Sequence, residues 1–324
     1  MREILRTSDT VCLSWLTALL ADCRIDAVVL DAHMSVLEGS ANAIPRRLMV
    51  VDEDYDAAMG LLAQAGELDG DNSSHPVAAQ SDDRADHVLG GRVVIRQPSG
   101  GYRSAIDPVL LAAAVPDVKN GCVLDVGSGV GTAALCYAMR AHEARVTGLE
   151  VQLQLARLAE HNVEANGVSA RMRVVVGDLL DPPSELQPAS FDEVMANPPY
   201  LQAEHADPSP NEVKAVSTIE GEADLACWVR FCVRMVKPAG GVTFIHRADR
   251  LDELLALLVG ATGDIVVFPL WPTTGQSAKR VIVRARCGAK GPLRLSAGMV
   301  LHDGANSFTA EAEGVLRGGA ILNL

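Results

Sequence analysis

The tetrad Asn197-Pro198-Pro199-Tyr200 combines groups that can bind a planar amine. The side-chain oxygen of Asn197 and the backbone carbonyl of Pro198 are hydrogen-bond acceptors, and the ring of Tyr200 offers a face for stacking. Two such acceptors can hold both hydrogens of an exocyclic or amide nitrogen. The same four residues could also form an ordinary turn at the end of a strand. The position of the tetrad in the fold decides between these interpretations.

The tetrad follows an apolar segment, residues 191–196, which predicts a buried strand. The two prolines lack an N–H donor, so the strand ends where they begin. In an open α/β sheet, ligands bind at the carboxyl ends of the strands. We therefore predict that Asn197, Pro198 and Tyr200 are catalytic residues that hold an amine during a reaction.

A glycine-rich turn lies upstream of the tetrad, between a predicted strand at residues 123–126 and a predicted helix at residues 132–140. It reads Gly127-Ser-Gly-Val-Gly131. Glycines allow the backbone to turn tightly and to approach a bound nucleotide closely. The third glycine comes one position early for the dinucleotide fingerprint, whose last position is Thr132 here. The turn therefore predicts a nucleotide-like ligand other than a nicotinamide dinucleotide.

Acidic residues end the next two predicted strands. Glu150 ends the segment 145–150, where its carboxylate could accept hydrogen bonds from both hydroxyls of a ribose. Asp178 follows the segment 173–177 and could bind an adenine amine. Both residues therefore extend the candidate binding site along the same edge of the predicted sheet.

The order of these strand ends resembles that of the class I S-adenosylmethionine-dependent methyltransferases, and Asn-Pro-Pro-Tyr resembles the amino-methyltransferase branch. The resemblance implies an α/β fold with a doubly wound, Rossmann-like, seven-stranded sheet. It also implies S-adenosylmethionine as the cofactor and no metal. Within the motifs quoted so far, the cofactor-binding residues that it implies are Asp125, Gly127, Gly129, Gly131, Glu150, Asp178, Leu179 and Asn197.

The stretch before the glycine turn, residues 89–111, extends the resemblance to the bacterial tRNA(Val) adenine-37 N6-methyltransferase group. The resemblance implies that Tyr102, Arg103 and Asp107 line the cofactor pocket, with Asp107 near the methionine ammonium. The residues alone give Asp107 a structural role, since an Asp followed by Pro108 is typical of a helix N-terminus.

Composition limits the class of protein. The chain has 324 residues, of which 48% are hydrophobic, so it can bury a full core and has room for two domains. No apolar run approaches the ~18 residues of a membrane span, and the first residues lack the apolar core of a signal peptide. The seven cysteines form no C-x-x-C pair, which favours reduced thiols over disulfides or a zinc site. We expect a cytoplasmic protein.

The net charge of −13 is unevenly distributed. Residues 1–86 hold 6 Lys or Arg against 16 Asp or Glu, whereas residues 87–324 hold 22 against 25. Residues 276–294 contain no acid, and their alternation predicts a strand with Arg280, Arg284 and Arg286 on one side. Together with Lys279, these side chains could bind RNA phosphates. They could equally be a solvated edge that prevents strand pairing.

The chain divides into three predicted parts: a small acidic α+β module at residues 1–68, a linker at residues 69–86, and the methyltransferase domain at residues 87–324. The module has a βαββα order, which suggests a ferredoxin-like fold. Its pattern resembles a small prokaryotic family of signal-transducing proteins, which implies a protein partner. Its acidity predicts that it lies away from an RNA substrate.

Three functions are consistent with these observations. The first is N6-methylation of adenine in RNA, most readily in a tRNA anticodon loop, where unpaired bases are accessible. The second is N5-methylation of a protein glutamine, because an amide presents the same two hydrogens to the tetrad. The third is a non-catalytic, cofactor-binding regulator whose first module docks a protein.

Overall fold

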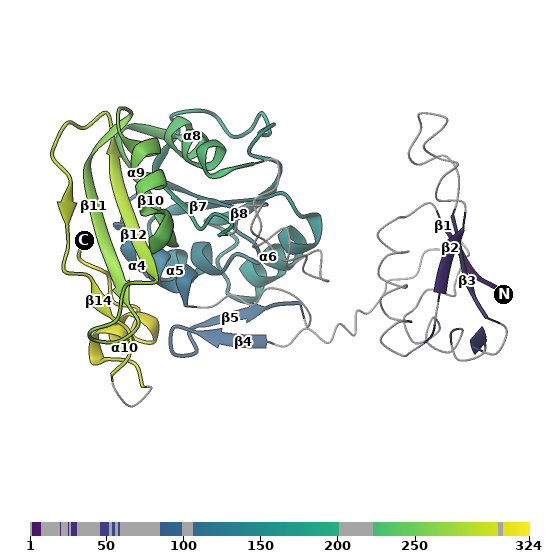
Figure 1. The fold of residues 1–324 in the computed structure, drawn as a ribbon. Helices are drawn as coiled ribbons and strands as arrows, with labels where there is room; N and C mark the ends of the chain where they lie inside the picture. Colours follow the sequence, from purple (N-terminus) through teal and green to yellow (C-terminus); the bar gives the residue numbers. More distant parts are fainter. Residues whose placement is uncertain are drawn as a thin grey trace. The chain divides into compact units, whose positions relative to one another are not determined.

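The computed structural model describes two compact units, Met1–Ala79 and Gln80–Leu324 (Figure 1). The boundary between them falls inside the predicted linker. The described residues are 2–7, 20, 25, 27–30, 46–51, 54–55, 58, 85–98, 106–200, 223–303 and 307–324.

The first unit contains an antiparallel sheet with the strand order β1-β3-β2. Ile4, Leu48 and Val50 are buried, so one face of the sheet carries a small apolar core. The two helices that the βαββα order predicts, at residues 9–21 and 55–66, lie almost entirely outside the described residues. The three strands are β1 (Arg2–Thr7), β2 (Ala27–Leu30) and β3 (Arg46–Val50).

The second unit is built on one large sheet whose seven long strands have the order β8-β7-β6-β9-β10-β12-β11. All neighbours from β8 to β10 are parallel, and β12 is antiparallel to both of its neighbours. The long strands are β6 (Cys122–Val126), β7 (Arg145–Glu150), β8 (Met172–Val176), β9 (Phe191–Ala196), β10 (Val236–Arg247), β11 (Thr262–Trp271) and β12 (Arg280–Cys287).

Among the described residues the sheet has nine strands, two more than the seven expected. The two additional strands, β13 (Arg294–Leu295) and β14 (Met299–Val300), have two residues each and pair with β11 at the edge. Segments this short carry no alternation that sequence analysis could detect.

Helices cover both faces of this sheet, because its strands are apolar on both sides. On β6, Val123 packs into one core with helices α4, α5, α6 and α10, whereas Leu124 packs into the other core with α8 and α9. This arrangement confirms the expected doubly wound α/β fold. The helices are α4 (Asp107–Ala114), α5 (Thr132–Arg140), α6 (Leu153–Ala165), α8 (Leu225–Met235), α9 (Leu251–Leu258) and α10 (Ala310–Leu316), and the 3₁₀ turn η3 (Ala248–Arg250) precedes α9.

The strand order reverses between β6 and β9, which is where open sheets of this kind bind ligands. The register pairs Val126 of β6 with Ala196 of β9. Gly127 and Asn197 directly follow these two residues, so the glycine turn and the tetrad begin side by side at the carboxyl edge.

A β-hairpin is fastened to helix α6 by two asparagines. Its strands are β4 (Ala85–Val88) and β5 (Val93–Arg96). The Asn162 amide accepts from Arg96 N at 2.8 Å and donates to Arg96 O at 3.1 Å and to Val130 O at 2.9 Å. The Asn166 amide likewise accepts from Val94 N at 2.9 Å and donates to Val94 O at 2.7 Å. These amides take the place of a neighbouring strand along the edge of β5.

Replacing Asn162 with alanine should lower the free energy of unfolding by ~2–3 kcal/mol, because three hydrogen bonds are lost and buried backbone groups remain unsatisfied. Asn162 is fully buried. Urea denaturation would measure the change. Glu164→Ala is the matched control, because Glu164 is exposed on the same helix and its loss should be nearly neutral. Equal stability of the two variants would contradict the prediction.

Candidate functional site

The glycine turn has a conformation that requires glycine. Gly127, Gly129 and Gly131 have φ values of 67°, 55° and 85°, in the left-handed region. A Cβ atom on Gly127 would lie 2.4 Å from Cη2 of Trp228. The turn is tied to the end of β7 because Ser128 N donates to Leu149 O at 2.9 Å. Its backbone is therefore held against the pocket that follows the sheet edge.

Two buried carboxylates lie at this turn. Asp125 is 2% exposed, and its Oδ2 accepts a hydrogen bond from Ala134 N at the start of α5, at 3.1 Å. Glu150 is 5% exposed, and its Oε2 accepts from Gly129 N at 2.8 Å while Oε1 accepts from Gln152 N at 2.9 Å. Glu150 therefore fixes the turn from the end of β7.

Burial determines the protonation of both carboxylates. It raises the pKa of Asp125 to about 7; the Ala134 N–H lowers the pKa, and the charge of Glu150 raises it further. Burial also raises the pKa of Glu150, against the lowering effect of the backbone donors at Gln152 and Gly129. A cationic ligand group beside Asp125 would favour the ionised carboxylate.

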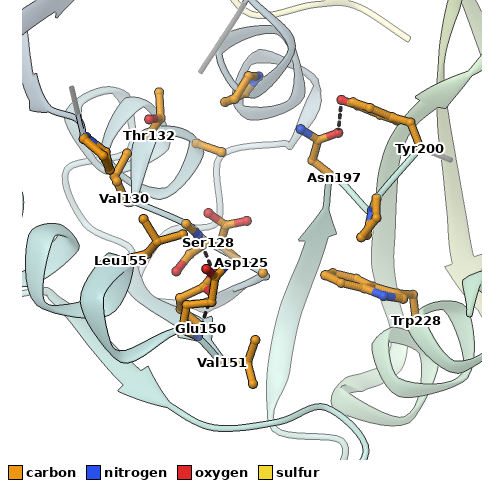
Figure 2. A pocket seen from close by; sticks show the side chains of 17 residues that line it. Asp125, Ser128, Val130, Thr132, Glu150, Val151, Leu155, Asn197, Tyr200 and Trp228 are labelled. Carbon is orange, nitrogen blue, oxygen red and sulfur yellow. Dashed lines mark hydrogen bonds between the residues drawn. The ribbon is translucent and has the colours of Figure 1, made fainter. Parts of the chain in front are cut away.

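A single pocket brings these groups together with the tetrad (Figure 2). In Figure 2, Asp125 and Glu150 lie on one side and Asn197 and Tyr200 on the other, at the ends of different strands. The pocket therefore joins the two parts that the sequence predicts as one site. Its lining residues are Pro98, Pro108, Asp125, Gly127, Ser128, Gly129, Val130, Thr132, Ala133, Glu150, Val151, Gln152, Leu155, Asn197, Pro199, Tyr200 and Trp228.

Tyr200 is held by polar and aromatic contacts. Its hydroxyl lies 2.8 Å from Asp107 Oδ2 and also contacts Asn197 Oδ1. Arg280 Nε donates to the same Asp107 oxygen at 3.0 Å, and the guanidinium carbon of Arg280 lies 4.5 Å from the centre of the Tyr200 ring. The His246 ring packs edge-on against Tyr200 at 5.8 Å, and burial lowers the pKa of His246 to about 4, so this ring is neutral. The Tyr200 hydroxyl thus joins the tetrad to helix α4 through Asp107. Arg280 of strand β12 contacts both Asp107 and the Tyr200 ring.

The predicted basic strip does not form one surface. Arg280 starts β12 opposite Arg247, at the carboxyl edge of β10, and Arg286 lies opposite Gly241 at the other end of the sheet. Arg284 lies between them and is partly buried against Glu193, with Arg284 Nη2 2.7 Å from Glu193 Oε1. The alternation of β12 is as expected, but Arg284 in its middle is engaged by Glu193. Only Arg280 of the three arginines reaches the pocket residues.

The remaining predicted site residues either do not line the pocket or lie outside the described residues. Lys279 is exposed, and Pro198 is buried and is not among the pocket-lining residues. Asp178 and Leu179 follow β8 but do not line the pocket, and Asp178 Oδ1 accepts from Leu180 N at 2.9 Å. Gly131 precedes α5, directly after the lining residue Val130. Tyr102 and Arg103 lie outside the described residues.

Sequence analysis missed several lining residues. Val151 and Gln152 directly follow Glu150, so their position at a strand end was a usable signal. Trp228 gave no signal, because it lies on the apolar side of α8 and reads as an ordinary core residue. It reaches the pocket through its contact with Gly127.

The described residues contain no helix that is long and apolar enough to cross a membrane. Within the same part of the chain, no three His, Cys, Asp or Glu side chains gather as a metal site would require.

Two protein-family models match parts of the chain. Residues 105–212 match the family described as "Methyltransferase small domain". Residues 1–66 match the family described as "Putative prokaryotic signal transducing protein". Both matches agree with the resemblances seen in the sequence.

The curated relatives include tRNA and release factor methyltransferases. A tRNA1(Val) (adenine(37)-N6)-methyltransferase of Porphyromonas gingivalis is 31% identical over 170 residues, covering 50% of this chain and 66% of that protein. The protein of the same name from Aeromonas hydrophila is 28% identical, covering 55% and 74%. A release factor glutamine methyltransferase of Chlorobaculum tepidum is 36% identical over 93 residues, covering 28% and 32%. The chain thus spans just under two thirds of the length of the P. gingivalis relative.

A crystal structure described as a predicted O-methyltransferase from Agrobacterium tumefaciens has the same fold, with a TM-score of 0.57 and 25% identity over 67% of this chain and 98% of that one. The second unit is therefore a methyltransferase domain, and its cofactor is S-adenosylmethionine. The site fits this cofactor, because a glycine turn with left-handed backbone lies beside two buried carboxylates.

Binding of the cofactor should depend on pH through Asp125. Because the pKa of this carboxyl is about 7 in the free protein, the proton must leave before Asp125 can attract the cationic methyl donor. The affinity should therefore fall by about tenfold for each pH unit below ~6.5. Calorimetry in buffers of different ionisation enthalpy would detect proton release on binding at pH 6. Asp125→Asn should bind more weakly with no such release, and an affinity that is constant from pH 5.5 to 7.5 would contradict the prediction.

Proposed function

We propose that this protein transfers the methyl group of S-adenosylmethionine to the N6 atom of an adenine in tRNA, in the anticodon loop. One observation carries the proposal. Asn197, Pro199 and Tyr200 line the same pocket as Asp125 and Glu150, so acceptors for an amine and groups for the cofactor share one space.

The chemistry requires positioning more than acid–base catalysis. When bound, S-adenosylmethionine supplies an electrophilic methyl group and a neutral thioether as the leaving group. The acceptor nitrogen shares its lone pair with a π system, so its attack is the difficult step. Hydrogen bonds from the amine to Asn197 Oδ1 and to the Pro198 carbonyl favour a pyramidal nitrogen and stabilise its developing charge. With the cofactor bound, the N–C bond would form as the C–S electron pair moved to sulfur, and the amine proton would then leave to solvent.

Several features favour an RNA substrate. The curated relatives from P. gingivalis and A. hydrophila are named for adenine-37 methylation of tRNA1(Val). Unpaired bases of an anticodon loop can turn out of their stack and into a pocket. Arg280 is partly exposed beside Tyr200 and can contact a phosphate next to such a base.

Glutamine N5-methylation is the second candidate. The C. tepidum relative is named as a release factor glutamine methyltransferase. A glutamine amide presents two hydrogens to Asn197 and Pro198 in the same way as an adenine amine. The two candidates differ in what surrounds the nitrogen, which is a flat ring in one case and a flexible chain in the other.

An assay with labelled S-adenosylmethionine distinguishes the candidates. The purified full-length protein is incubated with bulk unmodified tRNA and, separately, with release factors. We expect label on tRNA that is released by digestion as N6-methyladenosine. Label on a glutamine, with tRNA unlabelled, would establish the second candidate instead, and absence of label on either would reject both.

A further inference from the structure

The Tyr200 hydroxyl contacts two acceptors but has one proton to donate. Among the described residues, Asp107 Oδ2 lies 2.8 Å away and the Asn197 side chain approaches through Oδ1. Figure 2 shows the Asn197 oxygen turned to the hydroxyl and its nitrogen on the side away from Tyr200. One of these two contacts therefore lacks a proton.

Asp107 is the stronger acceptor of the two. It is 7% exposed and also accepts a hydrogen bond from Arg280 Nε at 3.0 Å, so a partly exposed guanidinium lies against its carboxylate. A hydrogen bond to a carboxylate is roughly twice as strong as one to a neutral amide oxygen. The phenolic proton is therefore expected to lie towards Asp107.

This choice determines how Asn197 must point. Once the proton is shared with Asp107, the phenol oxygen can only accept, and an amide oxygen against it would be repelled. The amide of Asn197 then turns over, so that Nδ2 donates to the phenol oxygen. Its Oδ1 faces the opposite side, where an amine in the pocket can donate to it.

We infer that Asp107 and Tyr200 are positioning residues that orient the Asn197 amide so that Oδ1 faces the acceptor amine, and that Arg280 holds Asp107 in place. The inference rests on the proposed function. It adds which residues set the orientation of Asn197 Oδ1, the side-chain acceptor for the amine. Figure 2 draws the amide with Oδ1 towards Tyr200, and the inferred orientation differs from it by a half-turn of the amide.

The inference assigns Asp107 a different task from the one that the sequence implies. Pro108 lines the pocket, whereas Asp107 does not, and its Oδ2 is already engaged by Tyr200 and Arg280. Loss of its carboxylate should therefore lower kcat and leave cofactor affinity within about threefold. A residue that binds the methionine ammonium would give the opposite result.

A double-mutant cycle on methyl transfer tests the inference. Tyr200→Phe and Asp107→Ala should each lower kcat about 10- to 30-fold, because the amide is no longer held in the productive orientation. The double variant should be no more than about threefold slower than the slower single variant, since both act through one hydrogen bond. Asp107→Asn should retain at least about a third of kcat, because its amide oxygen can accept the same proton.

Calorimetric binding of S-adenosylmethionine shows that each variant is folded. Additive losses in the double variant, or an Asp107→Ala effect confined to cofactor affinity, would overturn the inference. If the wild-type protein transfers no methyl group to tRNA or to release factors, the proposed function fails first. Transfer by the wild type without coupling between the two residues rejects the orienting role alone.

Discussion

Asn197→Ala should turn over about 10²- to 10³-fold more slowly than the wild type, because it removes an acceptor whose hydrogen bond strengthens as the amine becomes cationic. The effect should appear in kcat. Affinity for S-adenosylmethionine should change by less than about threefold, since Asn197 is one of many lining residues and the buried carboxylates remain. Single-turnover methyl transfer and calorimetric binding measure the two quantities separately.

A matched control is Gln187→Ala, which removes an exposed side-chain amide before β9 and away from the pocket lining. Its turnover should equal that of the wild type. Asn197→Asp adds a second comparison, because it keeps acceptor oxygens but places a charge beside the amine. A loss smaller than tenfold in Asn197→Ala would mean that the Pro198 carbonyl alone positions the acceptor.

Strand ends were the predictable part of the site. Residues 123–126 and 191–196 are mostly apolar and are followed by Gly127 or by Asn197 and two prolines, so both the strands and their ends can be read locally. Parallel neighbours then bring those ends to one edge, which the pairing of Val126 with Ala196 shows. Local signals of this kind depend only on the chain's own sequence pattern.

The contact around Tyr200 could not be predicted in this way. Asp107 and Arg280 are 173 positions apart, and nothing in either segment encodes the other. Asp107 followed by proline predicts an N-cap at Asp107, but Ile106 takes that position and Asp107 is the first residue of the helix. Arg280 reads as one charge of a basic run. Their meeting depends on β12 lying beside β10, which is a property of the whole sheet.

The basic run shows why charge in sequence is an uncertain guide to surface. The alternation of side chains correctly placed Arg284 in a strand. It carried no information about Glu193, its ion-pair partner two strands away on β9. Gly241 lies between them in the sheet, and a Cβ atom there would be 2.2 Å from Glu193 Oε2 and 2.7 Å from Arg284 Nη2. The glycine thus makes room for an ion pair that removes Arg284 from the candidate RNA surface.

Arg284→Ala should therefore lower the free energy of unfolding by about 3–5 kcal/mol, because it leaves Glu193 buried without its cation. The two side chains are 20% and 7% exposed. Burial raises the pKa of Glu193, and Arg284 lowers it, so the variant carboxyl should have a still higher pKa than in the wild type. A folded-state pKa above the unfolded value means that stability falls as pH rises. Urea denaturation should show a larger loss at pH 8 than at pH 5.

Two companion variants test the cause of this loss. Arg286→Ala, on the same strand but at an exposed position, should change stability by less than about 0.5 kcal/mol. Combining Glu193→Leu with Arg284→Met should restore most of the stability lost in Arg284→Ala, because apolar side chains of similar size can replace a buried ion pair. If Arg284→Ala unfolds like the wild type and instead weakens tRNA binding as much as Arg280→Ala does, the arginine contacts RNA as its sequence pattern suggests, and the ion pair contributes little to folding.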